Sequence, residues 1–302
     1  MGVKYFDTLD KARAFNDDTN VLDCIFQCFD NIIHTGIGFD PNGFFIQVVL
    51  RWNKSVDITV ALADQLGVRL GCGTADERTA MKPHFKSFNR RATFIRPGMA
   101  LVGKGTFGAF VYKDSKEYLL SCRHVLDDQD HESGIYLKEP YWDDKLIARY
   151  DANYYLGPLD CGIARVESDM VSKIKPEILG IGFAPKQVIA PSLGQKVAKY
   201  GPATFRQFGY VRLVDVRRER NQRFKYFEVQ PFDNGDNSFA RNGDSGSLVV
   251  IENDRVNAVG MVFEEVTYDL SGVMTRSLQV PKGALCISME DITRELKISL
   301  TN

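Results

Sequence analysis

Residues 241–250 read RNGDSGSLVV, and this stretch is compatible with two very different kinds of protein. Glycine, aspartate and serine crowd together, and an apolar run that favours β structure follows at once. The pattern fits a polar turn that leads into an ordinary buried strand. It also fits a loop that presents the hydroxyl of Ser245 for chemistry. A serine hydroxyl is a poor nucleophile without a base to take its proton, so the choice depends on the rest of the chain.

Histidine is the usual base near neutral pH. The chain contains four histidines, His34, His84, His124 and His131. His34 falls in an N-terminal stretch with hairpin character, and His84 and His131 fall in polar segments. Only His124 ends an apolar, strand-like run, YLLSCRHVL at residues 118–126. A lone histidine at such a position is commonly a surface residue, but the loop at Ser245 gives it a partner. We therefore predict that His124 is the base.

The base needs a carboxylate that accepts its second N–H and fixes its tautomer. Asp160 is the one acid in the apolar run LDCGIARV at residues 159–166, where a buried charge requires a hydrogen-bond donor. The alternatives, which lie in polar surroundings, are Asp127, Asp128 and Asp151. We predict that Asp160 orients His124.

Together these segments resemble the chymotrypsin-like (trypsin-like) serine peptidases. Three segments follow one another in that family's order. They are the strand end with the base (LSCRHV), the strand with the acid (LDCGIARV) and the nucleophile loop (GDSGS). GTFGAFV at residues 105–111 and GQKVAKYG at residues 194–201 are similar to the opening strands of the two barrels in its bacterial and intracellular branches. The resemblance extends over roughly residues 97–298.

The resemblance implies a mainly β fold, a chymotrypsin-like double β-barrel with a C-terminal helix, over residues 96–302. Short apolar runs separated by turn signals, with no helices between them, favour a sandwich or barrels. Residues 1–95 read differently. Residues 18–30 have the spacing of an amphipathic helix, and two β-prone runs around DPNG predict a hairpin. We expect a small α+β domain plus linker there, which controls access or binds a regulatory protein partner.

The resemblance also implies a mechanism. Ser245 would attack the scissile carbonyl of a protein or peptide, His124 would transfer the proton, and Asp160 would hold the imidazole. The backbone N–H groups of Gly243 and Ser245 would form the oxyanion hole, and no cofactor would take part. The chain would then be a serine endopeptidase that works through an acyl-enzyme. The alternative is a binding module with the peptidase fold that is catalytically silent or activated by a partner.

Two features depart from the secreted members of that family. The chain has no apolar dipeptide at its start whose freed amine could pair with Asp244, so we expect Asp244 to have a different partner. Phe239, just ahead of the nucleophile loop, brings no fixed charge to the base of the primary pocket. Glu264 and Glu265 would supply negative charge from the pocket wall, which gives a slight preference for basic substrates.

The composition argues against several other functions. The 38 basic residues nearly balance the 39 acidic ones, so no overall field recruits nucleic acid or a membrane surface. The basic stretch DVRRERNQRFKYFEV at residues 215–229 is better explained as a solvated hairpin tip. Cys24, Cys28 and His34 lack the close Cys-x-x-Cys pair of most structural zinc sites, so we expect no metal. The scattered cysteines and the absence of a signal-like N-terminus predict a cytoplasmic protein.

Overall fold

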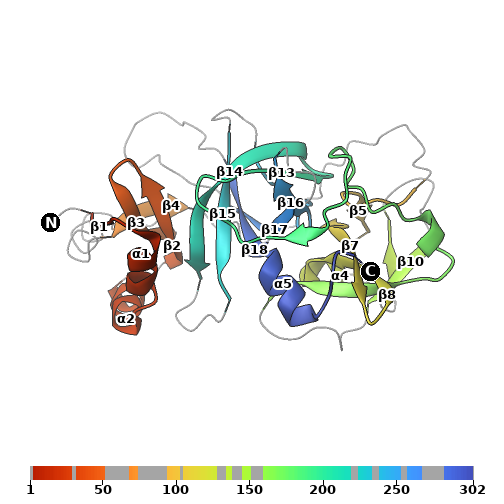
Figure 1. Cartoon of the computed structure of the whole chain (residues 1–302), viewed down its shortest axis with the longest axis horizontal. Helices are drawn as coiled ribbons and strands as arrows, with labels where there is room; N and C mark the ends of the chain where they lie inside the picture. Colours follow the sequence, from red (N-terminus) through yellow and green to blue (C-terminus); the bar gives the residue numbers. More distant parts are fainter. Residues whose placement is uncertain are drawn as a thin grey trace.

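The computed structural model shows a mainly β chain with a few short helices (Figure 1). It describes residues 3–28, 32–51, 68–73, 94–102, 105–127, 134–137, 145–150, 159–218, 224–232, 238–252, 257–266 and 282–301. Several residues considered above fall outside these ranges, namely His84, His131, Asp128, Asp151 and most of the predicted linker.

The N-terminal part contains the predicted hairpin and two helices. Its strands are β1 (Tyr5–Phe6), β2 (Ile32–Asp40), β3 (Gly43–Arg51) and β4 (Arg69–Gly73), and its helices are α1 (Leu9–Asn16) and α2 (Thr19–Cys28). β2 and β3 are antiparallel with Asp40 opposite Gly43, so the DPNG turn closes the hairpin. Leu22 and Ile25 of α2 are buried, which confirms the apolar face expected for this helix.

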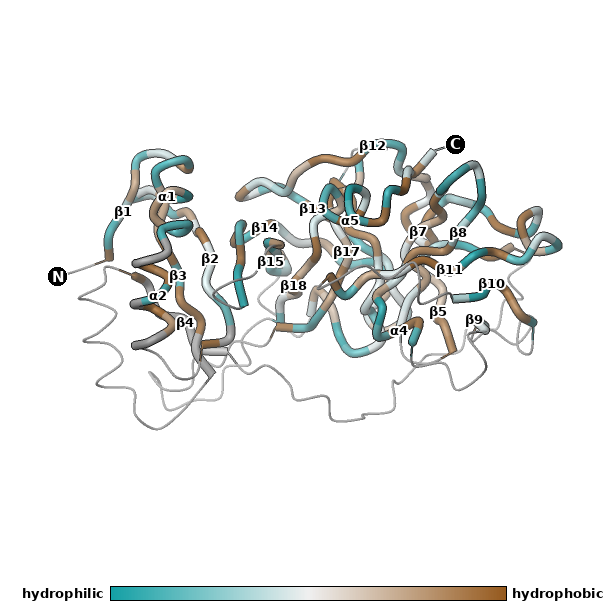
Figure 2. The backbone as a smooth tube through the Cα atoms, turned by 90° about the horizontal axis from the view of Figure 1, so that it is seen from below, coloured by the Kyte–Doolittle hydropathy of each residue, from teal (hydrophilic) through white to brown (hydrophobic). Residues whose placement is uncertain are grey.

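The first barrel is built from short antiparallel strands. They are β5 (Ala100–Leu101), β6 (Gly105–Thr106), β7 (Ala109–Lys113), β8 (Lys116–Ser121), β9 (Gly134–Tyr136), β10 (Leu146–Tyr150) and β11 (Gly162–Val166). One sheet has the order β7-β8-β11-β10-β9, and a bridge between Leu101 and Leu137 joins it to the β5–β6 pair. Apolar stretches on β7 and β11 (brown in Figure 2) supply part of its core.

The second barrel closes on itself. Its strands are β13 (Lys196–Gly201), β14 (Phe205–Arg217), β15 (Tyr226–Pro231), β16 (Leu248–Ile251), β17 (Asn257–Val266) and β18 (Gly283–Ser288). Their order around the barrel is β13-β14-β15-β18-β17-β16 and back to β13. The short elements η2 (Val171–Lys173) and β12 (Gln187–Val188) precede it, and helix α5 (Met289–Leu296) follows it. The predicted double β-barrel with a C-terminal helix is confirmed.

The N-terminal hairpin joins the second barrel edge to edge. β2 pairs antiparallel with β14, with Ile37 opposite Val214 and Thr35 opposite Arg217, so one eleven-stranded sheet runs through both parts. Figures 1 and 2 both show β14 and β15 between the N-terminal strands and the rest of the molecule. The sheet therefore crosses the boundary that the sequence predicts near residue 95.

A buried polar cluster lies in this junction. Nε2 of His34 is 3.2 Å from Oε2 of Glu228, and Arg212 donates to both oxygens of the same carboxylate, at 2.5 and 3.2 Å. The side chains of His34 and Glu228 are completely buried. Burial raises the pKa of the Glu228 carboxyl, but the charge of Arg212 and the contact with His34 outweigh it and hold this pKa below its ordinary value.

Replacing Glu228 with glutamine should destabilise the fold, because it removes the buried negative charge that accepts both hydrogen bonds from Arg212. We expect the free energy of unfolding at neutral pH to fall by about 3 kcal/mol. The depressed pKa stabilises the fold above the ordinary carboxyl value, and this stabilisation disappears as the pH falls through the folded value. E228Q should therefore lose less stability on acidification than the wild type does, as measured by urea unfolding at several pH values.

The matched control is Glu167→Gln, which removes an exposed pair with Arg149. This change should cost less than about 1 kcal/mol. Equal losses in the two variants would contradict a structural role for the buried cluster.

Candidate active site

β8 and β11 bring His124 and Asp160 together. The strands pair with Ser121 opposite Gly162, so the residues after β8 lie beside those before β11. Nδ1 of His124 contacts Oδ2 of Asp160, and the His124 backbone N–H donates to Oδ1 at 2.9 Å. His124 does not end the strand itself but lies in the first turn of the short helix α4 (Arg123–Asp127). One carboxylate thus orients both the ring and the backbone of the histidine.

Ser245 lies in a tight loop between a turn at residues 241–244 and β16. The Asp244 N–H donates to the Arg241 carbonyl at 2.9 Å, and Gly243 has a φ of 104°, which the third position of a type II turn requires. Within the described part of the chain, no acceptor meets the backbone N–H groups of Gly243 and Ser245. Two unoccupied donors so close in the chain are suited to binding an oxyanion.

Phe263 of β17 contacts both His124 and Ser245. The Ser245 hydroxyl donates to the Phe263 carbonyl at 3.3 Å, and the rings of Phe263 and His124 meet edge to face with centroids 6.4 Å apart. The histidine and the serine predicted to act together therefore share one neighbour. Across the described residues, no hydrogen bond joins the Ser245 hydroxyl to the His124 ring.

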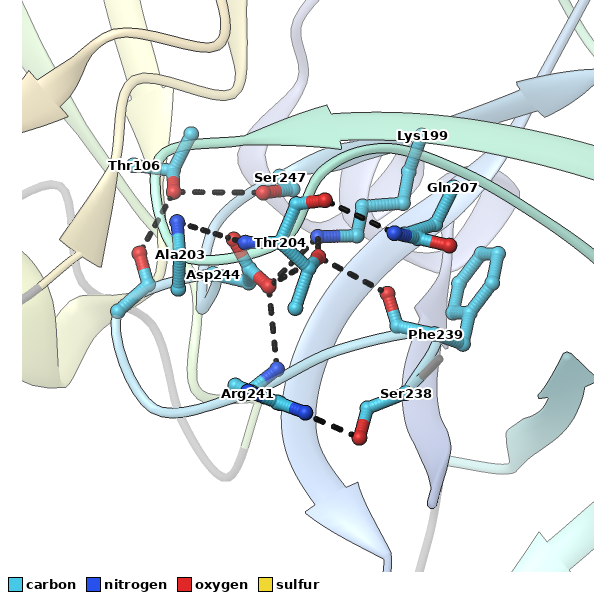
Figure 3. Close-up of polar contacts among 11 residues, drawn as sticks. Thr106, Lys199, Ala203, Thr204, Gln207, Ser238, Phe239, Arg241, Asp244 and Ser247 are labelled. Carbon is cyan, nitrogen blue, oxygen red and sulfur yellow. Dashed lines mark hydrogen bonds and ion pairs between the residues drawn. The ribbon is translucent and has the colours of Figure 1, made fainter. Parts of the chain in front are cut away.

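A completely buried ion pair fixes the residue before Ser245 (Figure 3). Nζ of Lys199 lies 2.6 Å from Oδ2 of Asp244. The same carboxylate accepts hydrogen bonds from the Thr204 hydroxyl at 2.7 Å and from the N–H groups of Ala203 and Arg241, each at 3.0 Å. Burial lowers the pKa of Lys199, while the charge of Asp244 opposes this shift. The partner expected for Asp244 is thus an internal lysine.

Thr106 ties the first barrel to the nucleophile loop. Its hydroxyl donates to the Gly243 carbonyl at 2.9 Å, and its N–H donates to the Ser245 carbonyl at 2.8 Å. Gly246 has a φ of 93°, and a Cβ atom there would lie 2.5 Å from the Thr106 carbonyl oxygen. The close approach of the two barrels at this point therefore requires glycine.

The residues predicted to form a primary pocket have other contacts. Phe239 is completely buried among the apolar residues of the second barrel. Glu264 pairs with Arg218 at 3.0 Å, and Glu265 pairs with Lys282 at 2.7 Å. Because a cation compensates each glutamate, the structure adds no support for a preference for basic substrates.

The basic stretch at residues 215–229 is not simply a solvated hairpin tip. Arg217 and Lys225 both pair with Asp17, at 2.7 and 3.0 Å, and Arg218 pairs with Glu264. Arg220 and Arg223 lie outside the described residues. The described cations of this stretch are therefore engaged in ion pairs within the chain.

The described residues contain no group of three or more side chains that could hold a metal ion. Glu228 engages His34, and the side chains of Cys24 and Cys28 lie outside the description. Cys122, Cys161 and Cys286 are buried free thiols. Among the helices described, none is long and apolar enough to cross a membrane.

Sequence reasoning did not identify Lys199, Thr106 or Phe263. The signal for Lys199 is a lysine in the middle of GQKVAKYG, a run that forms a buried strand. A buried lysine needs an anion nearby, and the sequence alone had left Asp244 without an identified cation partner. Thr106 and Phe263 carry no comparable signal, because their roles come from contacts between distant segments.

Replacing Lys199 with methionine should weaken the fold, because it leaves the Asp244 carboxylate buried without a cation. We expect the free energy of unfolding to fall by about 3–5 kcal/mol, as measured by urea unfolding. Lys196→Met is the matched control, since Lys196 is the exposed lysine at the start of the same strand. A double variant, K199M/D244N, removes both charges and should be more stable than K199M. A loss no larger than that of K196M would count against the ion pair.

Comparisons with known proteins agree with this fold. No protein-family model and no curated protein sequence matches the chain. One similar solved structure is a glutamic acid-specific serine protease that uses a histidine triad in substrate binding. It is 15% identical to this chain with a TM-score of 0.51, and the match covers 68% of this chain and 99% of that protease. Protease A of Thermobifida fusca is 14% identical with a TM-score of 0.48, covering 68% of this chain and 97% of its own. An alpha-lytic protease homolog, N4, is 15% identical with a TM-score of 0.47, covering 69% of this chain and all of its own. The similarity to the glutamic acid-specific protease, together with the two barrels described above, shows that the chain has the fold of the chymotrypsin-like serine proteases.

Proposed function

We propose that this chain is a serine endopeptidase. The observation that carries the proposal is the Asp160–His124 contact beside a serine loop whose Gly243 and Ser245 N–H groups have no acceptor among the described residues. A general base with a fixed tautomer and a pair of free donors are the two components that acyl transfer from a peptide bond needs. The fold of the known serine proteases supports the same reaction class.

In the proposed reaction, the Ser245 oxygen adds to the scissile carbonyl while Nε2 of His124 takes the hydroxyl proton. Asp160 holds the other ring nitrogen and stabilises the imidazolium that forms. The carbonyl oxygen becomes an oxyanion and accepts hydrogen bonds from the N–H groups of Gly243 and Ser245. His124 then gives its proton to the leaving amine. In the second half of the reaction, water adds to the acyl carbonyl while His124 takes its proton, and His124 returns that proton to the Ser245 oxygen as the carboxylic acid leaves. No cofactor takes part.

A second candidate is a peptidase-fold binding module that is silent or activated by a partner. It is favoured by the Ser245 hydroxyl, which donates to the Phe263 carbonyl and not to His124 in the described part of the chain. Catalytic hydrogen bonds are often long or misaligned in unliganded enzymes and shorten when substrate binds. The same geometry would also hold the serine inactive until a regulatory protein binds, and the N-terminal part is our candidate for that contact.

We also propose a substrate class and a cellular compartment for this enzyme. The substrate is a protein or a peptide, and we place the enzyme in the cytoplasm because its described cysteines are buried free thiols. This would make it an intracellular relative of the bacterial serine proteases with an added N-terminal domain. Neither nucleic acid nor a membrane is among its proposed partners.

A fluorophosphonate probe tests the proposal directly, because it reacts with activated serine hydroxyls. The purified wild type should form an adduct that mass spectrometry maps to Ser245. Ser245→Ala should abolish labelling, and His124→Ala should slow it by at least about a hundredfold. Labelling that appears only in lysate would favour the partner-activated module. An adduct absent under both conditions would rule out the peptidase.

Asp160→Asn should slow labelling by roughly 10²–10⁴-fold without unfolding the protein, because the amide no longer fixes the reactive tautomer of His124. Asp127→Asn is the matched control. Asp127 was a rival for the same role and instead forms an exposed pair with Arg123. Its removal should leave the labelling rate within about twofold of the wild type, since exposed pairs contribute little. Equal effects of the two changes would disprove the assignment of Asp160.

A further inference from the structure

The end of β14 contains a β-bulge that lies against helix α1. Relative to β15, the register shifts between Leu213, opposite Glu228, and Val216, opposite Tyr226, so β14 has one extra residue there. The register with β2 shifts at the same place. Asp215 in the bulge has a φ of 53°, a left-handed conformation that is costly for a residue with a side chain. Neighbouring contacts must hold it in place.

Helix α1 supplies part of those contacts. Nε of Arg13 donates to Oδ2 of Asp215 at 2.8 Å, and Nδ2 of the buried Asn16 donates to the Asp215 carbonyl at 3.3 Å. Lys225, at the start of β15, lies 3.7 Å from the same carboxylate. The N-terminal helix and the bulge therefore form one polar unit.

Asp17 extends this unit to Arg217, the last residue of β14. It caps the C-terminal end of α1 and pairs with Arg217 at 2.7 Å and with Lys225 at 3.0 Å. Partial burial raises the pKa of Asp17, but the ion pairs with Lys225 and Arg217 outweigh it and lower this pKa. The Asp17 carboxylate consequently holds the side chain of Arg217 just after the bulge, although the two segments are far apart in sequence.

Arg218 carries this constraint to the candidate active site. Its guanidinium lies 5.4 Å from the centroid of the Phe263 ring, and its Nη1 lies 3.0 Å from Glu264. Tyr226, which pairs with Val216 of the bulge, stacks on Phe263 with centroids 5.4 Å apart and an interplanar angle of 8°. Phe263 in turn accepts the hydrogen bond of Ser245 and packs against the His124 ring.

We propose that Asp17 is a positioning residue for the candidate active site, which it reaches through Arg217, Arg218 and Phe263. The inference rests on the proposed function and assigns the N-terminal part a role in it. With the Asp17 carboxylate present, the end of β14 holds Arg218 on Phe263, and Phe263 keeps its contacts with His124 and Ser245. Without it, Arg217 and Lys225 lose the carboxylate that they share, the chain beside the strained bulge is held less firmly, and the wall of the site loosens.

The test compares fluorophosphonate labelling rates at Ser245 in the full chain. Asp17→Asn should label at least about fivefold more slowly than the wild type, the lower end of couplings between distant sites. Asp17→Glu keeps the charge and should stay within about twofold of the wild type. Arg218→Gln should slow labelling as Asp17→Asn does. The double variant should be no slower than the slower single, because both changes break the same chain of contacts.

Asp10→Asn is the matched control, since Asp10 lies on the same helix with its side chain 95% exposed. It should leave the rate unchanged. A rate for D17N within twofold of D10N, with an active wild type, would overturn the inference, and so would a D17N that loses thermal stability without a change in rate.

A wild type that is unlabelled both as pure protein and in lysate would overturn the proposed function instead. In that case, amide hydrogen exchange over residues 257–266 still decides the coupling. Faster exchange in D17N than in D10N supports it, and equal exchange refutes it.

Discussion

The buried pair of Lys199 and Asp244 is the constraint on which the candidate site depends. Neither charge reaches solvent, so each is stable only in the presence of the other and of the hydrogen bonds around them. The Asp244 carboxylate meets those needs by accepting from Thr204, Ala203 and Arg241, and these contacts join the turn after β13 to the turn before Ser245. A loop of small polar residues thereby acquires one conformation. The cation that compensates Asp244 comes from within strand β13.

The site itself exists only where the two barrels meet. The first barrel supplies His124 and Asp160, and the second supplies Ser245 and Phe263. Thr106 reaches across and binds the backbone on both sides of Asp244, so the two halves cannot separate without losing buried hydrogen bonds. Because His124 and Ser245 lie on different barrels, their relative position is a property of barrel packing and not of either loop alone.

The sequence predicts local features well and contacts between distant segments poorly. The contact between His124 and Asp160 was predictable because strand ends and a single acid in an apolar run leave local traces. The N-terminal hairpin follows from turn signals and β-prone runs, whereas the double barrel was implied by the family resemblance, because the strand pattern alone also fits a sandwich. In contrast, the pairing of β2 with β14 and the bulge at Asp215 depend on which edges meet in space, and no local pattern records this. The contacts of Glu264 and Glu265 with Arg218 and Lys282 have the same origin, so the sequence showed these two charges but not their partners.

The edge-to-edge pairing of β2 and β14 also limits how the N-terminal part can influence the barrels. A unit that swung away as a rigid body would break the shared sheet and expose His34 and Glu228, both completely buried at the junction. Such a motion is costly because it would break the pairing of β2 with β14, leave two strand edges unpaired and separate His34 from Glu228. A smaller change at the bulge would break ion pairs. These pairs are partly exposed to solvent and contribute little to stability individually. A partner that binds the N-terminal part should therefore affect the site through β14. Residues of α1 bind Asp215 in the bulge, and Arg218, just after β14, lies over the Phe263 ring.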